Sequence, residues 1–462
     1  MDRIVNTETP KHLGKKIKVS GWADSVRAHG KIIFIDLRDT TGLVQLVCPK
    51  ELAERIRPEW VIEVEGKVSK RPKNMLNPKI ETGKIEISAE NLKVLSQAKT
   101  LPFSIALSGR EISEEKRMKY RYLDLRRARM KKNLEERQRV LRFIRDFLQK
   151  QGFLEIETPI LTKSTPEGAR DFIVPSRLQP GKFYALPQAP QQYKQLLQVA
   201  GIEKYFQIAR CFRDEDPRAD RQAEFTQLDM EMSFVKQKDV MEITEKLFIE
   251  LIRKLYPEKK IQKIPFPRLS YKKAMEKYKT DRPDLRKDKK NPNILSFCWI
   301  IDFPFFEKEE NGAWTFTHNP FSAPKPEFSE DLLKKKNIEN ILTTQYDIVL
   351  NGWELGGGSI RNHRPEALES VFEIIGYKKK EIKEKFGHML EAFKYGAPPH
   401  GGIAPGIDRF LAILLGESNI REVIAFPKTG DSRDLMMGSP SEISETQLKE
   451  LKIKTLKKPK KN

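Results

Sequence analysis

Apolar and polar residues alternate along several short runs within residues 1–100, and turns containing Gly, Asp or Pro separate these runs. A period of two is typical of a strand that is buried on one face. The pattern predicts five strands: Lys16–Trp22, Lys31–Arg38, Gly42–Cys48, Val61–Val68 and Lys84–Leu95. Five strands in a small basic segment favour a compact barrel of the kind that binds oligonucleotides.

Two side chains on the second and third predicted strands are candidates for contact with single-stranded bases. Phe34 offers a ring for stacking, and Gln45 offers an amide for base edges. The alternative is that Phe34 belongs to the barrel core and Gln45 is simply solvated, and the sequence leaves both possibilities open.

Helical spacing follows the connector at 101–133. Within Asn133–Gln151, apolar residues gather on one side of a helix: Leu134, Val140, Leu141, Ile144, Phe147 and Leu148. The helix is expected to end at Gly152 and to lead into the strand Phe153–Thr158, which Pro159 stops. Such a unit can pack against a second copy of the chain or within one chain, and the sequence does not separate the two.

The run Phe225–Met232 predicts a strand with one apolar and one polar face. Its polar face carries Phe225, Gln227, Asp229 and Glu231, and the preceding strand presents Gln207, Ala209, Cys211, Arg213 and Glu215 on one face. This combination suits a nucleotide, because a ring stacks on the base, guanidinium binds phosphate, and carboxylates bind a metal or an amine. An exposed hairpin with solvated charges is the alternative.

Two later segments carry matching chemistry. Tyr346–Arg361 places Asp347 and Glu354 around a strand and turn with three consecutive glycines, and paired carboxylates suit Mg²⁺ beside a triphosphate. Gly401–Gly416 runs from a strand into an apolar helix with Arg409 in its first turn, where it can reach a phosphate or a base. An ordinary glycine turn and a surface arginine are the respective alternatives.

The charge of the chain favours a polyanionic partner. Lys and Arg number 86 against 65 acidic residues, which gives a net charge of +21, and nucleic acid is the usual partner of such a surface, although a generally basic proteome is an alternative. The three widely spaced cysteines indicate neither a disulfide framework nor a zinc site. No apolar run is long enough to cross a bilayer, so we expect a cytoplasmic protein without membrane contact.

Several familiar catalytic patterns are missing from the sequence. It contains neither a P-loop nor a Gly-x-Gly-x-x-Gly run after a strand, and its six histidines lack metal-ligand spacing. No Ser or Cys nucleophile stands out. Catalysis is therefore expected to rest on electrostatics and positioning.

Basic residues are also concentrated outside the candidate site. Lys116–Lys132 holds nine basic residues and one acid, which suits either contact with a phosphate backbone or a solvated helix face. Residues 279–293 are polar and are expected to form a surface connection. Lys449–Asn462 holds seven lysines and one glutamate, and is expected to be a basic tail.

These segments resemble the signature motifs of class II aminoacyl-tRNA synthetases. The strand pair around Phe225 resembles the second motif, Gly406-Ile-Asp-Arg409 with its helix the third, and the helix and strand ending at Pro159 the first. Three further segments resemble the bacterial type of aspartyl-tRNA synthetase: Leu161–Phe172, Ala185–Leu196 and Phe393–Gly402. The resemblance extends from about residue 15 to residue 440.

The resemblance implies a role for most polar residues of these motifs. Arg213, Arg409 and Glu354 are implied to be catalytic, and Phe225 and Arg409 to sandwich adenine. The residues implied to bind ATP are Arg213, Asp214, Glu215, Gln222, Phe225, Glu354, Gly406, Ile407, Asp408 and Arg409. Those implied to surround L-aspartate are Glu167, Gln191, Lys194, Arg213, Asp229, His318 and Arg361. Asp347 and Glu354 are implied to hold Mg²⁺, and Arg27, Phe34 and Gln45 to contact the anticodon.

Two departures from the family pattern stand out. Bacterial members carry a large inserted domain between the stretches resembling Tyr278–Arg286 and Trp299–Glu307, whereas here only residues 287–298 join them. His29, with Gly83 further on, resembles the relaxed kind of enzyme that charges tRNA(Asn) as well as tRNA(Asp).

The sequence thus predicts an α+β protein with an antiparallel-sheet class II catalytic domain and an N-terminal five-stranded OB-fold barrel. The expected domains are the barrel at 1–100, a connector at 101–133, a catalytic domain at 134–428 with its insertion reduced to a short linker near 279–295, and an extension at 429–462. A homodimer is expected.

The expected activity is ligation of L-aspartate to tRNA(Asp), and also to tRNA(Asn), with ATP as a substrate. A non-tRNA ligase is disfavoured by the barrel, and an inactive RNA-binding module by the presence of Arg213, Glu354 and Arg409. Asparagine is a closer rival as substrate. We expect Lys194 and Arg361 to disfavour it, on the argument that an amide would leave two buried cations without a counter-charge.

Overall fold

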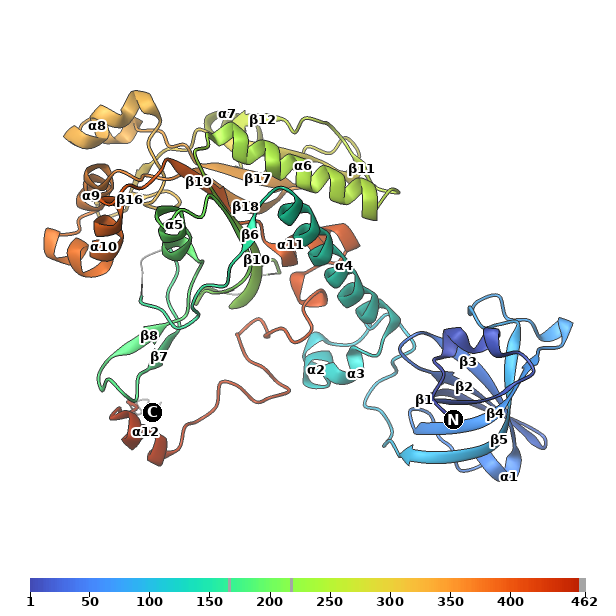
Figure 1. Ribbon diagram of the computed structural model, residues 1–462. Coiled ribbons are helices and arrows are strands. Elements are labelled where there is room, and N and C mark those ends of the chain that lie inside the picture. The colour runs from blue at the N-terminus through green and yellow to red at the C-terminus, as the bar shows by residue number, and fades with distance from the viewer. Residues whose placement is uncertain (165–167, 217–218, 457–462) are drawn as a thin grey trace. The chain divides into compact units, whose positions relative to one another are not determined.

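The computed structural model describes residues 1–164, 168–216 and 219–456. The chain divides into two compact units, Met1–Ser104 and Ile105–Asn462 (Figure 1). Each unit has its own hydrophobic core.

The N-terminal unit is a closed five-stranded barrel with strand order β1-β2-β3-β5-β4. Its strands are β1 (Lys16–His29), β2 (Ile32–Arg38), β3 (Leu43–Pro49), β4 (Val61–Lys70) and β5 (Ile85–Ser96), and α1 (Lys50–Ala53) follows β3. The barrel prediction is confirmed, but β1 is longer than expected. It pairs with β4 through its first half and with β2 through its second half, so one strand belongs to both sides of the closure.

The larger unit is built on an eight-stranded sheet with the order β12-β14-β17-β18-β19-β10-β9-β6. All neighbours pair antiparallel except β12 with β14 and β6 with β9. The expected antiparallel catalytic sheet is therefore confirmed. Its strands are β6 (Leu154–Glu155), β9 (Lys204–Phe212), β10 (Glu224–Ser233), β12 (Arg268–Ser270), β14 (Phe297–Ile301), β17 (Tyr346–Leu350), β18 (Trp353–Ile360) and β19 (His400–Ile403).

Three helices pack against the apolar face of this sheet: α4 (Ala128–Lys150), α6 (Gln237–Leu255) and α11 (Ile407–Leu415) (Figure 1). They share one core with Leu228, Met230 and Met232 of β10, as the period of two predicts. The predicted strand after α4 is shorter than expected. The N–H of Ile156 still donates to the carbonyl oxygen of Phe206 on β9, but the N–H of Thr158 donates to the side chain of Gln207 instead of to a strand backbone.

The remaining elements surround this core. The helices are α2 (Glu114–Lys119), α3 (Arg121–Asp124), α5 (Gln191–Val199), α7 (Tyr271–Tyr278), α8 (Ser329–Lys334), α9 (Pro365–Ile374), α10 (Lys379–Phe393) and α12 (Glu445–Leu451). Three strand pairs complete the unit: β7 (Ile173–Pro175) with β8 (Phe183–Ala185), β11 (Lys260–Ile261) with β13 (Ile294–Leu295), and β15 (Phe306–Lys308) with β16 (Trp314–Phe316).

The basic run Lys116–Lys132 is not simply a solvated or phosphate-binding face, and that prediction is wrong for three of its five arginines. Arg117, Arg121 and Arg127 are buried, and each forms an ion pair with Asp124, which is itself fully buried. Spacing alone cannot show this arrangement, because further acidic partners come from a segment about 300 residues later.

Among the described residues, no helix is both long and apolar enough to span a lipid bilayer.

Candidate active site

A cavity of about 290 Å³ opens on the polar face of the eight-stranded sheet. It brings together residues from α5, β10, β18, α11 and the loop after β9. The predicted site residues that line it are Gln191, Lys194, Arg213, Glu215, Gln222, Phe225, His318, Asp347, Glu354, Arg361, Gly406, Asp408 and Arg409. The segments that looked independent in sequence thus meet at one place.

At one end of the cavity Lys194 and Arg361 line the wall, and their carboxylate partners Asp229 and Glu231 are fully buried. Lys194 Nζ lies 2.6 Å from Asp229 Oδ1 and 3.5 Å from Glu231 Oε2. Arg361 donates to both oxygens of Glu231, at 2.8 and 3.0 Å, and to Ser359 Oγ at 2.8 Å. All four charged side chains are at most 3% exposed.

Burial and pairing act in opposite directions on these carboxylates. Burial raises the pKa of Asp229, and the nearby Lys194 only partly offsets it. Burial also acts to raise the pKa of Glu231, but the charges of Arg361 and Lys194 outweigh it and lower that pKa. Asp229 Oδ2 is buried without a hydrogen-bond partner among the described residues, and Asp229, although predicted to contact the amino acid, does not itself line the cavity.

Glu231 is a site residue that the sequence reasoning did not assign, although its position on the same strand face as Asp229 was the available signal. Its presence corrects the argument about asparagine. Lys194 and Arg361 already have carboxylate partners, so an amide ligand would not leave them without counter-charges. Gly402 makes the pair possible, because a Cβ there would stand 2.2 Å from Glu231 Oε2.

The other end of the cavity is more open. Arg213 lies with its guanidinium 5.1 Å from the ring centre of Phe225, and its buried Nε has no hydrogen-bond partner among the described residues. Arg409 donates to the backbone oxygens of Glu354, at 2.8 Å, and Asp220, at 3.0 Å. An unpartnered guanidinium N–H beside an aromatic ring suits a phosphate next to a base.

Two carboxylates stand between these ends. Burial raises the pKa of Asp347 well above its ordinary value, and the charge of Glu354 raises it further. Two carboxylates this close repel each other when both are ionised, and a divalent cation bound between them would offset that repulsion. Mg²⁺ prefers oxygen ligands, so the two residues fit this ion. The described residues contain no cluster of three or more metal-ligating side chains, so other ligands would have to come from a substrate or water.

The three consecutive glycines have a steric cause within the protein. A Cβ at Gly356 would stand 2.4 Å from the backbone oxygen of Ala404, and one at Gly358 would stand 2.1 Å from that of Gly402. A Cβ at Gly357 would stand 2.6 Å from Asp347 Oδ1. The glycines therefore allow close packing of β18 against its neighbours. All three also line the cavity, so the expectation that they let a ligand approach stays a prediction.

Some predicted contacts are not supported at the level of side chains. Ile407 packs in the core beneath the cavity, and Asp214 is exposed and does not line it. Asp408 lines the cavity, but its carboxylate is engaged by Arg137 and by the N–H of Thr226. Glu167 lies outside the described residues.

His318 lines the cavity against an aromatic wall. Its ring packs edge-on against Phe303, with centroids 4.4 Å apart. Burial lowers its pKa, and the charge of Glu354 only partly offsets this, so the neutral ring is favoured.

The barrel carries its candidate residues on its outer face. Phe34 lies between Ile33 and Ile35, both of which point into the core, so the alternative that Phe34 is a core residue is wrong. Arg27 is paired with Phe34 across the strands and donates to Asp36. Gln45 is buried and donates to Glu86 at 3.1 Å, so it is not simply solvated.

The two residues predicted to set tRNA preference differ in environment. His29 is exposed at the end of β1. Gly83 is buried in a tight turn, where a Cβ would stand 1.7 Å from the backbone oxygen of Asn77. The glycine is therefore required by the turn itself.

The fold and the cavity agree with comparisons to known families. Residues 113–430 match the model of class II tRNA synthetases (D, K and N), and residues 17–95 match the model of the OB-fold nucleic acid binding domain. The chain belongs to the class II tRNA synthetase family.

Individual relatives sharpen this assignment. The chain is 44% identical to an aspartate–tRNA(Asp/Asn) ligase of Dictyoglomus turgidum, over 96% of each chain. It is 41% identical to a protein of the same name from Chlorobium phaeobacteroides strain BS1, over 95% of this chain and 93% of the relative. The first alignment extends over 578 residues, more than the 462 of this chain, so the relative contains residues with no counterpart here.

Solved structures share the fold at low sequence identity. Asparaginyl-tRNA synthetase from Pyrococcus horikoshii, complexed with asparaginyl-adenylate, superposes with a TM-score of 0.75 at 22% identity, over 93% of this chain and 98% of that one. Aspartyl-tRNA synthetase from Entamoeba histolytica superposes with a TM-score of 0.70 at 23% identity, over 92% of this chain and 91% of that one.

Proposed function

We propose that this chain is an aspartate–tRNA ligase that charges both tRNA(Asp) and tRNA(Asn). The observation that carries the proposal is a single cavity with a buried, charge-paired end for a small dicarboxylate and an open arginine-rich end for ATP. The names of the relatives, identical at 41–44% over nearly the whole chain, support the same activity.

The chemistry follows from the arrangement. An α-carboxylate oxygen of aspartate attacks the α-phosphorus of ATP, the bond to the β-phosphate oxygen breaks, and pyrophosphate leaves. A ribose hydroxyl of the terminal tRNA nucleotide then attacks the carbonyl carbon of aspartyl-adenylate, and AMP leaves. Arg213 stabilises the charge that develops on the α-phosphate, because it lines the cavity and its Nε has no competing hydrogen-bond partner among the described residues.

Asp347 and Glu354 would hold Mg²⁺. The ion would offset charge on the phosphates of ATP. The protein's own part is to keep the two carboxylates together: Gln345 Nε2 donates to Asp347 Oδ1 at 2.8 Å and fixes one of them.

Selection of aspartate over asparagine rests on donors rather than on net charge. A guanidinium has five N–H groups, and the bonds of Arg361 to Glu231 and Ser359 use three of them. The ammonium of Lys194 likewise offers only N–H. A side-chain carboxylate accepts from both, whereas the NH₂ of asparagine would meet donors and lose hydrogen bonds.

The barrel would bind the anticodon through the outer face that carries Arg27, Phe34 and Gln45. Phe34 is partly exposed there and available for stacking. His29, exposed at the end of β1, is the residue we assign to relaxed choice between the two tRNAs.

A homodimer is part of the proposal. β6 is the edge strand of the large sheet, and apolar side chains on it and beyond it are exposed: Leu154 at 55%, Ile160 at 39% and Leu161 at 52%. An apolar sheet edge of this kind is normally covered. Light scattering after size-exclusion chromatography would give twice the chain mass, and a monomer at micromolar concentration would contradict it.

The activity is tested by aspartate-dependent exchange of pyrophosphate into ATP. We expect Arg213→Ala to lower kcat/KM by at least about 100-fold, the effect of losing one charge-stabilising donor. Arg210→Ala is the matched control, because Arg210 is an exposed arginine on β9, three residues before Arg213, and lies outside the cavity. Exchange by Arg213→Ala at the level of the control would refute the assigned role.

A further inference from the structure

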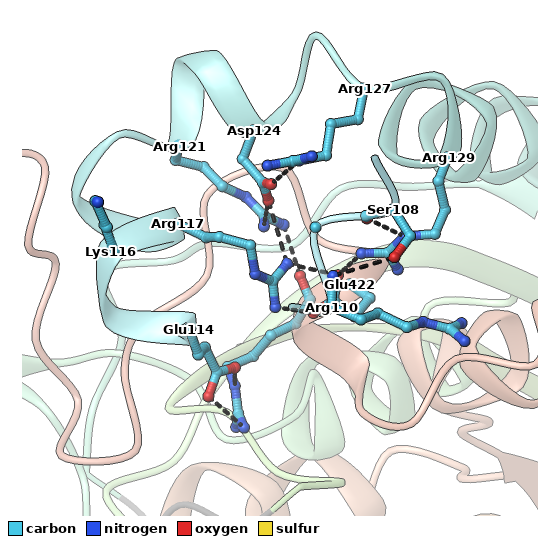
Figure 2. A network of polar contacts seen from close by, with 12 residues as sticks. Ser108, Arg110, Glu114, Lys116, Arg117, Arg121, Asp124, Arg127, Arg129 and Glu422 are labelled. Atoms are coloured by element: carbon cyan, nitrogen blue, oxygen red, sulfur yellow. Dashed lines mark hydrogen bonds and ion pairs between the residues drawn. The ribbon is translucent and has the colours of Figure 1, made fainter. Parts of the chain in front are cut away.

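Glu422 lies at the centre of a buried polar network that no step of the proposed reaction uses. Its carboxylate accepts from Arg117 at 2.7 and 3.1 Å and from Arg129 at 2.8 Å, and the residue is 4% exposed (Figure 2). Both arginines come from the stretch 114–129, which contains α2, α3 and the first residues of α4. The network therefore ties this stretch to a segment near the C-terminal end of the catalytic unit.

This stretch and the following helix α4 also donate hydrogen bonds to the backbone of that segment, residues 420–425. Arg121 donates to the carbonyl oxygens of Arg421, Ile424 and Ala425 at 2.7–2.8 Å. Asn133 donates to the carbonyl oxygen of Glu422 at 3.1 Å. Backbone carbonyls held by buried donors at several successive positions fix the path of the chain there.

The segment 420–425 forms part of the nucleotide end of the cavity. Ile420 lines the cavity, and its N–H donates to the carbonyl oxygen of Ala219 at 3.1 Å. The next residue, Asp220, receives Arg409 through its backbone oxygen at 3.0 Å and through its carboxylate at 3.4 Å. The position of Arg409 thus depends on a loop that Ile420 holds.

A second connection leads to the same end of the cavity. The carbonyl oxygen of Val423 accepts from Arg137 at 3.3 Å. Arg137 also donates to Asp408 Oδ1 at 2.5 Å and to Thr226 Oγ1 at 2.8 Å. Asp408 and Thr226 are the chain neighbours of Arg409 and Phe225, so both candidate adenine-binding residues stand next to this triad.

We propose that Glu422 is a positioning residue for ATP, through which the arginines of the stretch 114–129 hold the nucleotide end of the cavity in its binding geometry. The inference rests on the proposed function only in taking the ligand of that end to be ATP. It assigns Glu422 no contact with substrate. The paired charges of the amino-acid end have their own partners, and among the described residues they share no hydrogen bond with the network.

The test is Glu422→Gln, which keeps the shape of the side chain and removes the charge that pairs with the arginines. Steady-state pyrophosphate exchange should show KM for ATP raised by about tenfold, a change that corresponds to 1.4 kcal/mol, while KM for aspartate stays within about twofold. Calorimetric titration with ATP alone should show the same loss of affinity.

The matched control is Glu245→Gln. Glu245 is also a buried carboxylate of the same unit, where it accepts from Trp299 Nε1 and from the backbone N–H of Phe266, and none of these residues lines the cavity. The Glu245→Gln variant should be less stable than the unsubstituted protein but should show no selective change in KM for ATP. If Glu422→Gln does not fold, Arg129→Lys, at a side chain that is 17% exposed, should raise KM for ATP in the same direction by a smaller factor.

An unchanged affinity for ATP in Glu422→Gln, an equal rise of both KM values, or the same selective effect in Glu245→Gln would each overturn the inference. The proposed function fails by a different result, namely absence of aspartate-dependent exchange in the unsubstituted protein. In that case the calorimetric titration with ATP still decides whether Glu422 positions the nucleotide end.

Discussion

The two ends of the cavity balance their charges in different ways. At the amino-acid end, Lys194, Asp229, Glu231 and Arg361 pair with one another and are at most 3% exposed. At the nucleotide end, Arg409 and Asp220 are 22% and 21% exposed, and Arg221 and Glu215 are 41% and 29% exposed. The first end is therefore preformed, whereas the second keeps side chains that can adjust to a ligand.

This difference suggests how each end achieves its task. A buried, fully paired set of charges distinguishes between ligands by the N–H donors that remain unused. A ligand that cannot accept from these donors leaves them buried and unpaired. An open end with partly exposed arginines depends on its supporting structure to keep those arginines in position. In this protein that support comes from the segment around Glu422.

The largest effect is expected at the amino-acid end. Arg361→Ala removes the partner of a fully buried Glu231, and breaking a buried pair costs about 3–5 kcal/mol. We expect kcat/KM for aspartate to fall by at least about 1,000-fold in pyrophosphate exchange. Arg364→Ala, at an exposed ion pair close in the chain, is the control and should stay near the unsubstituted rate. Equal losses in both variants would contradict the contrast between the two ends.

A smaller effect is expected at the nucleotide end. Arg409→Lys keeps the charge but cannot reproduce the separate donations to the backbone oxygens of Glu354 and Asp220. We expect KM for ATP to rise by about 10- to 50-fold, with KM for aspartate little changed. The two values are separated by varying one substrate at saturation of the other. A rise confined to KM for aspartate would show that Arg409 belongs to the other end.

The support network makes a prediction about pH. Burial acts to raise the pKa of Glu422, but the hydrogen bonds and charges of Arg117 and Arg129 outweigh it and lower the pKa to about 2. A depressed pKa means that this carboxylate contributes stability above its ordinary pKa of 4.5 and loses that contribution as pH falls toward 2.

Chemical denaturation between pH 6 and pH 3 tests this prediction. The free energy of unfolding of Glu422→Gln should fall less over this range than that of the unsubstituted protein, because the variant has no carboxylate to protonate at that position. Parallel pH profiles of the two proteins would show that the pairing of Glu422 does not contribute to stability.

The smallest effect on the first chemical step is expected from the barrel. Phe34→Ala should weaken tRNA binding by about 1–3 kcal/mol, the contribution of one stacked base, and leave pyrophosphate exchange unchanged. Ile32→Ala is the matched control, since Ile32 is an exposed apolar residue on the same strand. Filter binding with tRNA measures the first quantity. Loss of exchange in Phe34→Ala would contradict the separation of the two functions.

Local patterns predicted the elements of the fold well and the long-range partners poorly. The period of two in Phe225–Met232 correctly separated the core face of Leu228 and Met230 from the cavity face. The strand and helix around Gly406 were likewise predictable, because turn, glycine and apolar helix follow one another in the chain.

What the sequence could not show was pairing between distant residues. Glu231 was visible as a polar residue on the right face, but its partner Arg361 is 130 residues away. The arginines of the connector looked like a solvated or nucleic-acid-binding run because their acid partners, Glu417 and Glu422, are in a distant segment. Likewise, the three glycines near Gly357 looked like a ligand approach, and only the neighbouring strand reveals their steric role.

The central claim is that the preformed end of the cavity is built for a carboxylate side chain. Pyrophosphate exchange with L-aspartate and L-asparagine, measured side by side at equal concentrations on the unsubstituted protein, tests it most directly. We predict that kcat/KM for aspartate exceeds that for asparagine by at least about 1,000-fold. A site whose buried donors are left unpaired by the wrong substrate discriminates by that order or more. Comparable exchange with asparagine would contradict the account.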